Sequence, residues 1–190
     1  MISQTQSLLS IDGSLGEGGG QVLRTSLALA LITGRPFTVT NIRSRRPKPG
    51  LMAQHLKAVE AAREIGKARV EGAVLGSQSL VFEPAGLTCG DFHFDIRTAG
   101  STSLVLQTIL PPLSFASARS TIALIGGTHV PWSPCFHFLE MHWLHYMQGS
   151  ALTFICSWML LASTPEVAAC WLRCNRSHDF RHCVLIIAER

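Results

Sequence analysis

The chain has few charged residues and no long apolar run, and both absences limit the classes of protein to which it can belong. Charged side chains make up 15% of the 190 residues, and hydrophobic residues make up 47%. No basic segment followed by an apolar one opens the chain, and no stretch of about 18 apolar residues occurs. We therefore expect neither secretion nor a membrane partner, but a cytoplasmic or nuclear protein with one compact core.

Cysteine and glycine are also absent from parts of the chain. All sixteen glycines lie at or before Gly149, whereas four of the six cysteines follow it. Only Cys89 and Cys135 fall in the well-patterned part, so no disulfide framework is indicated and reduced thiols are expected. The character of the sequence changes after Met147.

The standard nucleotide motifs are missing as well. The run GEGGGQ lacks the G-K-[ST] ending of a P-loop, and Gln21 stands where G-x-G-x-x-G needs its last glycine. A classical kinase or dehydrogenase is thus disfavoured. Four glycines nevertheless surround Glu17 directly before a predicted helix, where the backbone can approach a ligand and free N–H groups favour an anion. An isolated Glu17 would be explained as a carboxylate at a helix N-terminus, but its four glycines favour close approach by a ligand.

A cationic loop follows the next predicted strand. Arg43, Arg45, Arg46 and Lys48 place four of the sixteen basic residues within six positions. With Glu17 and its loop, this cluster suits a polyphosphate and its metal. Arg45 and Lys48 are also explained as a solvated charge run, and Arg24 as a solvated arginine in the first helical turn.

The order of predicted elements repeats. Strand, glycine turn, helix, strand, loop and helix fill residues 7–65, two strands follow at 68–73 and 80–83, and the order restarts at 92. The second copy is predicted as strand 92–96, helix 100–113, strand 121–125 and helix 134–147. We predict an α/β (α+β) fold of βαβαββ units, with helices on one face of a mixed sheet and about one and a half repeats present.

Several segments in this order resemble one family. The runs GEGGGQVLRTSLALALITG, RSRRPKPGLMAQHL, GSQSLVFEP, TAGSTSLVLQTILPPL and GGTHVPWSP are similar to those of the RNA 3'-terminal phosphate cyclases. The resemblance covers residues 8 to 148, with a first repeat at about 8–90 and a partial second repeat at about 91–148. It implies a partial cyclase domain, followed by an unmatched tail at 149–190.

The resemblance also implies roles and ligands. Glu17 would help hold Mg²⁺ or Mn²⁺, and Arg43 and Arg46 would lie near the phosphate end of the RNA. The nucleotide pocket would be lined by Arg24, Gln54, His55 and Gln107, and His129 would border the cleft. The implied partners are ATP and RNA 3'-phosphate ends, with no obligate protein partner. In the family a histidine takes AMP from ATP and passes it to the 3'-phosphate, and the 2'-hydroxyl then closes a 2',3'-cyclic phosphate.

The tail leads to an expectation about activity. We interpret residues 149–190 as the product of a shifted reading frame or alternative splice that ends a longer protein early. The nucleophilic histidine of the family lies in a later repeat, so a truncated form that is inactive alone is expected, with little packing of the tail against the body. The alternative is a noncatalytic binding protein, similar to the cyclase-like ribosome-assembly factors that share the fold. An unrelated role built on the tail has no residue-level support.

A metal-like spacing occurs in the tail. Cys170, Cys174, His178 and His182 recur at steps of four, but no turn separates the two pairs. On one helix they would climb about 6 Å per step, so all four could not converge on a zinc ion. We predict no bound zinc.

Overall fold

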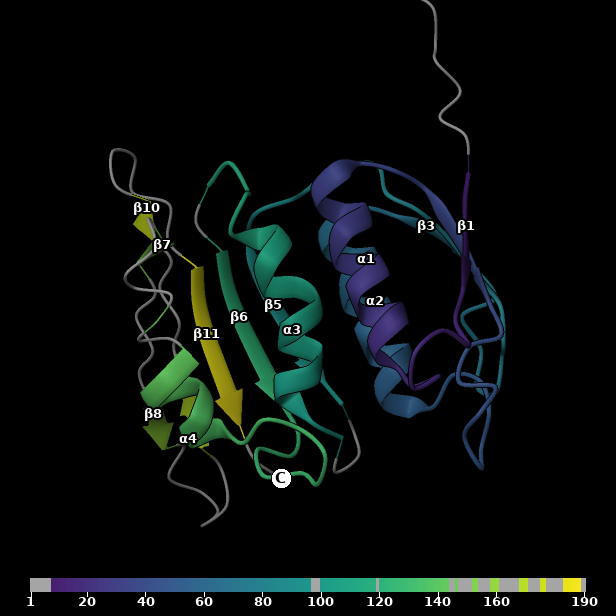
Figure 1. The fold of residues 1–190 in the computed structure, drawn as a ribbon. Helices are drawn as coiled ribbons and strands as arrows, with labels where there is room; N and C mark the ends of the chain where they lie inside the picture. Colours follow the sequence, from purple (N-terminus) through teal and green to yellow (C-terminus); the bar gives the residue numbers. More distant parts are fainter. Residues whose placement is uncertain are drawn as a thin grey trace, which may run out of the picture. The chain divides into compact units, whose positions relative to one another are not determined.

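A computed structural model describes residues 8–96, 100–118, 120–143 and 146, together with the backbone of five short strands between 152 and 188. The chain divides into two compact units, Met1–Leu87 and Thr88–Arg190. Each unit is a layer of helix on a layer of sheet (Figure 1). The predicted α/β class is confirmed.

Unit 1 is a four-stranded mixed sheet with two helices on one face (Figure 1). The strand order is β1-β2-β4-β3, with β1 parallel to β2 and the other two pairings antiparallel. The elements are β1 (Leu9–Asp12), α1 (Gln21–Thr33), β2 (Phe37–Thr40), α2 (Ala53–Gly66), β3 (Arg69–Glu71) and β4 (Leu80–Glu83). The predicted order of elements in the first repeat is therefore confirmed.

The core of unit 1 lies between the helices and the sheet. Leu23, Leu27 and Leu31 recur on α1 at helical spacing and are buried. On the sheet, the rings of Phe37 and Phe82 from neighbouring strands lie with their centroids 5.7 Å apart. The helices end where the sequence predicts. Gly34 adopts the left-handed conformation after α1 (φ 70°), and its N–H donates to the Ala30 carbonyl at 2.8 Å.

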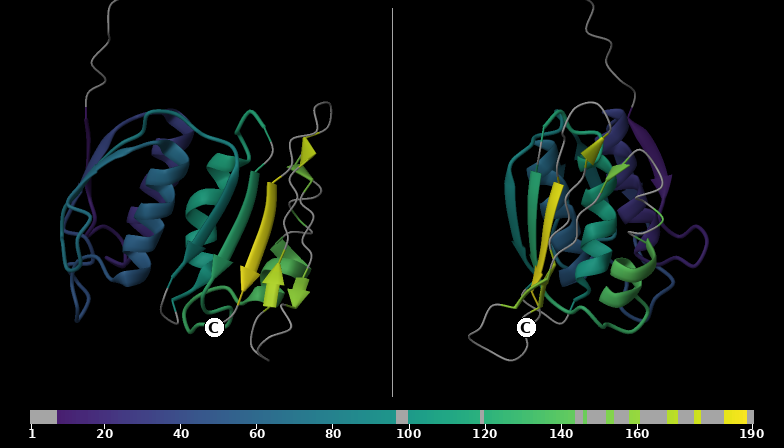
Figure 2. Two further views of the ribbon diagram at one scale, coloured as in Figure 1. Left: turned by 180° about the vertical axis from the view of Figure 1, so that it is seen from behind. Right: turned by 90° about the vertical axis from the view of Figure 1, so that its left-hand side faces the viewer.

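Unit 2 repeats the first half of this plan. Strand β5 (Asp91–Asp95) leads to α3 (Thr102–Leu113) and then to β6 (Ser120–Ile125), which pairs with β5 in parallel. Phe94, Ile109, Ile122 and Leu124 form its buried core. Helix α3 lies on one face of this sheet (Figure 2).

The second helix predicted for the second repeat differs from the expectation. Residues 134–147 were expected to form one helix, but the structure has a three-residue α4 (Phe136–Phe138) followed by a π-helical segment, η1 (Leu139–Trp143). The segment contains the apolar residues Phe136, Phe138, Leu139 and Met141, yet Phe136 alone is buried among these four. A short helix with one anchored aromatic has too little packing to hold a regular α-helix, since most helical stability comes from tertiary contacts.

The expectation that the tail packs little against the body is wrong for one segment. Strand β11 (Cys183–Ala188) pairs in parallel with β6 over six residues, from Cys183 opposite Ser120 to Ala188 opposite Ile125. Figure 2 shows β11 beside β6. A sheet edge offers unpaired N–H and C=O groups, and the apolar run CVLIIA supplies a strand that satisfies them. The other tail strands are β7 (Leu152–Thr153), β8 (Trp158–Leu160), β9 (Ala168–Cys170) and β10 (Asn175–Arg176).

Candidate phosphate-binding site

The glycine loop of unit 1 connects β1 to α1 and is fixed at its start. Asp12 accepts hydrogen bonds from the Ser14 N–H (2.9 Å), the Ser14 hydroxyl (2.9 Å) and Asn41 Nδ2 (3.1 Å). These bonds, the backbone N–H of Ser14 first, hold the pKa of Asp12 below its usual range. Farther along, Gly16 and Gly18 have φ of 61° and 57°, which favour glycine. At the tip of the loop, Glu17 is therefore flanked on both sides by residues without a side chain.

The cationic loop lies directly against the glycine loop. A Cβ placed on Gly18 would lie 3.1 Å from Cβ of Arg45, and one on Gly19 would lie 3.1 Å from Nη2 of Arg46. The guanidinium of Arg46 also pairs with the Glu17 carboxylate, with Nη2 and Oε2 3.5 Å apart. The predicted placement of both loops at one end of the sheet is confirmed.

His55 is buried behind the glycine loop. Its side chain sits on the first turn of α2, and the residue is 5% exposed. The Met52 N–H donates to Nδ1 of His55 at 3.2 Å, so the neutral ring carries its proton on Nε2. That nitrogen faces Gly20, because a Cβ on Gly20 would collide with it. Burial first, and then the charges of Arg43 and Arg24, lower the pKa of His55 to about 4.

Arg24 reaches the same glycine from α1. It is 8% exposed, and its Nη1 lies 2.8 Å from where a Cβ on Gly20 would be. Its Nη2 donates to Oε1 of Gln21 at 3.0 Å, which orients the guanidinium toward the helix N-terminus. Burial lowers the pKa of Arg24, although an arginine remains charged. The buried guanidinium of Arg24 and the neutral imidazole of His55 thus both lie against Gly20 at the start of α1.

Arg43 holds the cationic loop closed. Its Nη1 donates to the carbonyls of Lys48 and Gly50, each at 2.8 Å. Its backbone is left-handed, with φ of 53°. Burial, and then the charge of Arg46, lower its pKa. The sequence did not reveal this structural role, because nothing in the run RSRRPKPG distinguishes the arginine that turns inward.

The remaining predicted site residues are Gln54 in unit 1, and Gln107 and His129 in unit 2. Gln54 is half-buried on the first turn of α2. Gln107 is exposed on α3 and belongs to unit 2. In the loop that follows β6, Nδ1 of His129 lies 2.9 Å from the Thr128 hydroxyl, and its Nε2 lies 3.1 Å from Nδ1 of His137. The structure thus brings together five of the predicted residues, Glu17, Arg24, Arg43, Arg46 and His55, all in unit 1.

No protein-only metal centre occurs in the described part of the chain. Within it, no group of three or more histidine, cysteine or carboxylate side chains is arranged to hold an ion. Cys174, His178 and His182 of the tail pattern lie outside the described residues. Glu17 still fits a magnesium ion shared with a ligand, because Mg²⁺ is commonly held by one or two carboxylates together with substrate phosphates. Its side chain is 93% exposed and beside a cation, where a phosphate would also bind.

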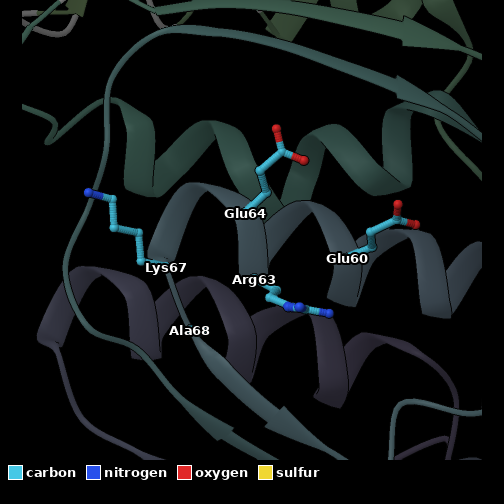
Figure 3. Close-up of a pocket in the computed structure, with 5 residues that line it drawn as sticks. All are labelled: Glu60, Arg63, Glu64, Lys67 and Ala68. Atoms are coloured by element: carbon cyan, nitrogen blue, oxygen red, sulfur yellow. The ribbon is translucent and has the colours of Figure 1, made fainter.

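A shallow hollow lies elsewhere on unit 1. Its lining consists of Glu60, Arg63 and Glu64 of α2, with Lys67 and Ala68 directly after the helix (Figure 3). Two acids and two bases line the hollow, so it has no net charge that would select an anion. The described helices include none that is long and apolar enough to cross a membrane.

Comparison with known proteins places the chain in one family. A model of the RNA 3'-terminal phosphate cyclase family matches residues 15–166, past the end at 148 that the sequence suggested. The chain is 56% identical over 133 residues to the RNA 3'-terminal phosphate cyclase of Hyperthermus butylicus, covering 70% of this chain and 37% of that protein. It is 54% identical over 140 residues to the enzyme of that name from Ralstonia nicotianae, covering 74% of this chain and 40% of that protein.

The chain belongs to the RNA 3'-terminal phosphate cyclase family. Its matched part spans about two fifths of the length of these relatives. The loops built around Glu17, Gly20 and Arg46 fall within the matched residues.

Proposed function

We propose that this chain provides the ATP- and phosphate-binding part of an RNA 3'-terminal phosphate cyclase, which converts an RNA 3'-phosphate to a 2',3'-cyclic phosphate at the expense of ATP. The observation that carries the proposal is the convergence of Arg24 and His55 on Gly20. Backbone N–H groups at the start of α1 and a buried guanidinium there give a negatively charged oxygen several donors at once.

The residues around Gly20 have different roles in this proposal. Arg24 and the Nε2–H of His55 donate to phosphate oxygens, and Arg46 offers a second guanidinium beside them. Glu17 would hold Mg²⁺ together with the phosphates, and the ion would neutralise phosphate charge. Because the proton of neutral His55 stays on Nε2, this ring acts as a donor rather than as a nucleophile. Gln54, on the first turn of α2, lines the nucleotide pocket in this proposal.

The geometry also leads us to propose that the 190-residue chain alone binds its ligands without being adenylylated. A nucleophilic imidazole needs an unprotonated nitrogen facing the phosphorus atom. The unprotonated nitrogen of His55 is instead occupied by the Met52 N–H. This proposal separates binding, which unit 1 can support, from the covalent step.

Binding measurements on the whole chain test the proposal. We expect ATP·Mg²⁺ to bind, and an RNA oligonucleotide with a 3'-phosphate to bind more tightly than the same oligonucleotide with a 3'-hydroxyl. Arg24→Gln should abolish the 3'-phosphate preference. Arg35→Gln, which removes an exposed arginine just after α1, is the matched control and should retain it. Equal affinity for both RNA ends would contradict the proposal.

Labelled ATP tests the covalent part separately. Incubation with ATP labelled at the α-phosphate should leave no acid-stable label on the chain. Label that appears and is lost in His55→Gln would show that His55 is the nucleophile after all. Label lost only in His129→Gln would assign the step to unit 2.

A further inference from the structure

The cations in and beside the cationic loop differ in burial and in partners, and Arg46 among them pairs with Glu17. Arg24 is buried and Arg43 is half-buried, both are hydrogen-bonded, and the charges of both act on His55. Arg45 and Lys48 are exposed. Within the described part of the chain, neither of these two side chains forms an ion pair or a hydrogen bond. We name Arg45 and Lys48 the outer cations.

The outer cations are held in place by the backbone around them. The Lys48 carbonyl accepts a hydrogen bond from Nη1 of Arg43, and the Arg46 N–H donates to the Arg43 carbonyl at 3.0 Å. The stem of Arg45 lies on Gly18, since Cβ, Cγ and Cδ of Arg45 are 3.1–3.3 Å from where a Cβ on Gly18 would be. A loop closed in this way presents its charges without first having to be ordered, which favours ligand binding.

We infer that Arg45 and Lys48 bind the phosphodiester backbone of a single-stranded RNA, upstream of the 3'-phosphate that the inner residues receive. This inference rests on the proposed function for the position of the RNA end. A terminal phosphate alone uses the donors around Gly20, and the loop then has two cations left for the next phosphates of a chain. Nonspecific contacts of this kind fix the register of a nucleic acid without reading its sequence.

The chemistry favours nucleic acid over a free nucleotide as the ligand of the outer cations. An exposed lysine or arginine gains little from one mobile anion, because water and salt screen the pair. A polyanion that is already anchored at its end presents further phosphates at high effective concentration. The outer cations should therefore contribute to affinity only when the RNA is long enough to reach them.

The experiment compares RNAs of two lengths on the full 190-residue chain. The double variant Arg45→Gln/Lys48→Gln is titrated with a 3'-phosphorylated dinucleotide and with a 3'-phosphorylated dodecamer at several salt concentrations. We expect roughly tenfold weaker binding of the dodecamer, with a log–log salt slope shallower by about 1.4, and less than a twofold change for the dinucleotide. Glutamine keeps part of each stem, so packing on Gly18 is largely retained.

A matched control removes two positive charges elsewhere in unit 1. Arg63→Gln/Lys67→Gln changes the hollow of Figure 3, whose two bases are likewise exposed, and should leave both RNAs unaffected. Thermal unfolding of each variant shows whether it is folded. An equal loss for the dinucleotide and the dodecamer, or an equal effect of the control pair, would overturn the inference.

The outcomes also separate this inference from the proposed function. If the wild-type chain prefers no particular RNA end, while the double variant still loses affinity only for the dodecamer, the outer cations bind RNA and the cyclase proposal fails. If the end preference is present and the double variant binds the dodecamer normally, the cyclase proposal stands and the outer cations are solvated charges.

Discussion

The loops that follow β2 in unit 1 and β6 in unit 2 occupy the same place in their units but carry different chemistry. The first contains four basic residues and is closed by Arg43 on the carbonyls of Lys48 and Gly50. The second, from Gly126 to Pro134, contains no lysine or arginine and is arranged around His129, with Trp132 fully exposed. A repeated scaffold therefore fixes where a loop lies, whereas the side chains of that loop decide what it can bind.

The sheets of the two units also differ, in the strands that pair with β2 and with β6. Beside β2 runs β4, which is antiparallel, whereas beside β6 runs β11, which is parallel. The neighbour of β2 comes from the same repeat, and the neighbour of β6 comes from residues 183–188. Any strand with matching N–H and C=O groups can pair with a free sheet edge. The choice of a partner strand at an edge is therefore less specific than the packing of side chains between a helix and the sheet.

The largest effect is expected from a substitution in the cationic loop. In Gly50→Ala, the new Cβ would collide with the carbonyl oxygen of Gly76, and φ at this position is 80°. Backbone on both sides leaves little room to relax, so we expect a loss of roughly 3 kcal/mol or more of unfolding free energy. Chemical denaturation measures it.

The control isolates collision from backbone strain. Gly76 has the same φ of 80°, but a Cβ there would meet nothing within 4 Å. Gly76→Ala should therefore lose only about 1–2 kcal/mol. Equal losses of unfolding free energy in the two variants would show that the collision with Gly76 is not what destabilises Gly50→Ala.

A second effect is specific to unit 1 and depends on pH. The pKa of His55 is about 4 when folded, against 6.5 for an unperturbed histidine. The unfolded chain therefore binds more protons between these values, so the unfolding free energy falls as pH drops from about 6.5 to about 4. Below the folded pKa, the accumulated loss is about 3 kcal/mol.

His55→Gln removes this contribution and leaves those of the carboxylates. The difference between the wild-type and variant curves of unfolding free energy against pH should slope between pH 6.5 and 4 and be flat above pH 7. A difference curve that is flat throughout would mean that His55 is solvated in the folded protein.

Much of this arrangement follows from the sequence, and the exceptions have physical causes. Glycine turns, helix ends and apolar periodicity placed β1 to β4 and α1 to α3 to within two residues at most ends, and the glycine and cationic loops were expected together. The burial of His55 was not predicted, because it depends on the close approach of α2 to Gly20 rather than on local pattern. The pairing of β11 with β6 was missed for a similar reason, since a strand partner far along the chain leaves no local signal.

A third, smaller effect contrasts the two strand-to-helix loops directly. Arg43→Gln removes two charge-assisted hydrogen bonds that close the first loop, and a half-buried site should lose about 1–2 kcal/mol. The exposed His129 has one part-buried contact with Thr128 and one exposed contact with His137, so His129→Gln should change stability by less than about 0.5 kcal/mol. Chemical denaturation of both variants compares how much the two loops contribute to stability. A larger loss of unfolding free energy in His129→Gln than in Arg43→Gln would contradict the prediction.

The smallest effect on stability is expected where the effect on binding is large. Glu17 and Arg46 form an exposed pair at 3.5 Å, with side chains 93% and 43% exposed, so Glu17→Gln should change the unfolding free energy by less than about 0.5 kcal/mol. If Glu17 holds Mg²⁺ with the phosphates, the same variant should lose the Mg²⁺-dependent part of ATP binding, because an amide is a poor ligand for this ion.

Glu71→Gln, which disrupts another exposed ion pair in unit 1, controls for the loss of one negative charge. Calorimetric titration of ATP with and without Mg²⁺ distinguishes the two variants. If Glu17→Gln binds ATP·Mg²⁺ as the wild type does, the carboxylate serves only to orient Arg46, and unit 1 contributes phosphate donors but no metal ligand.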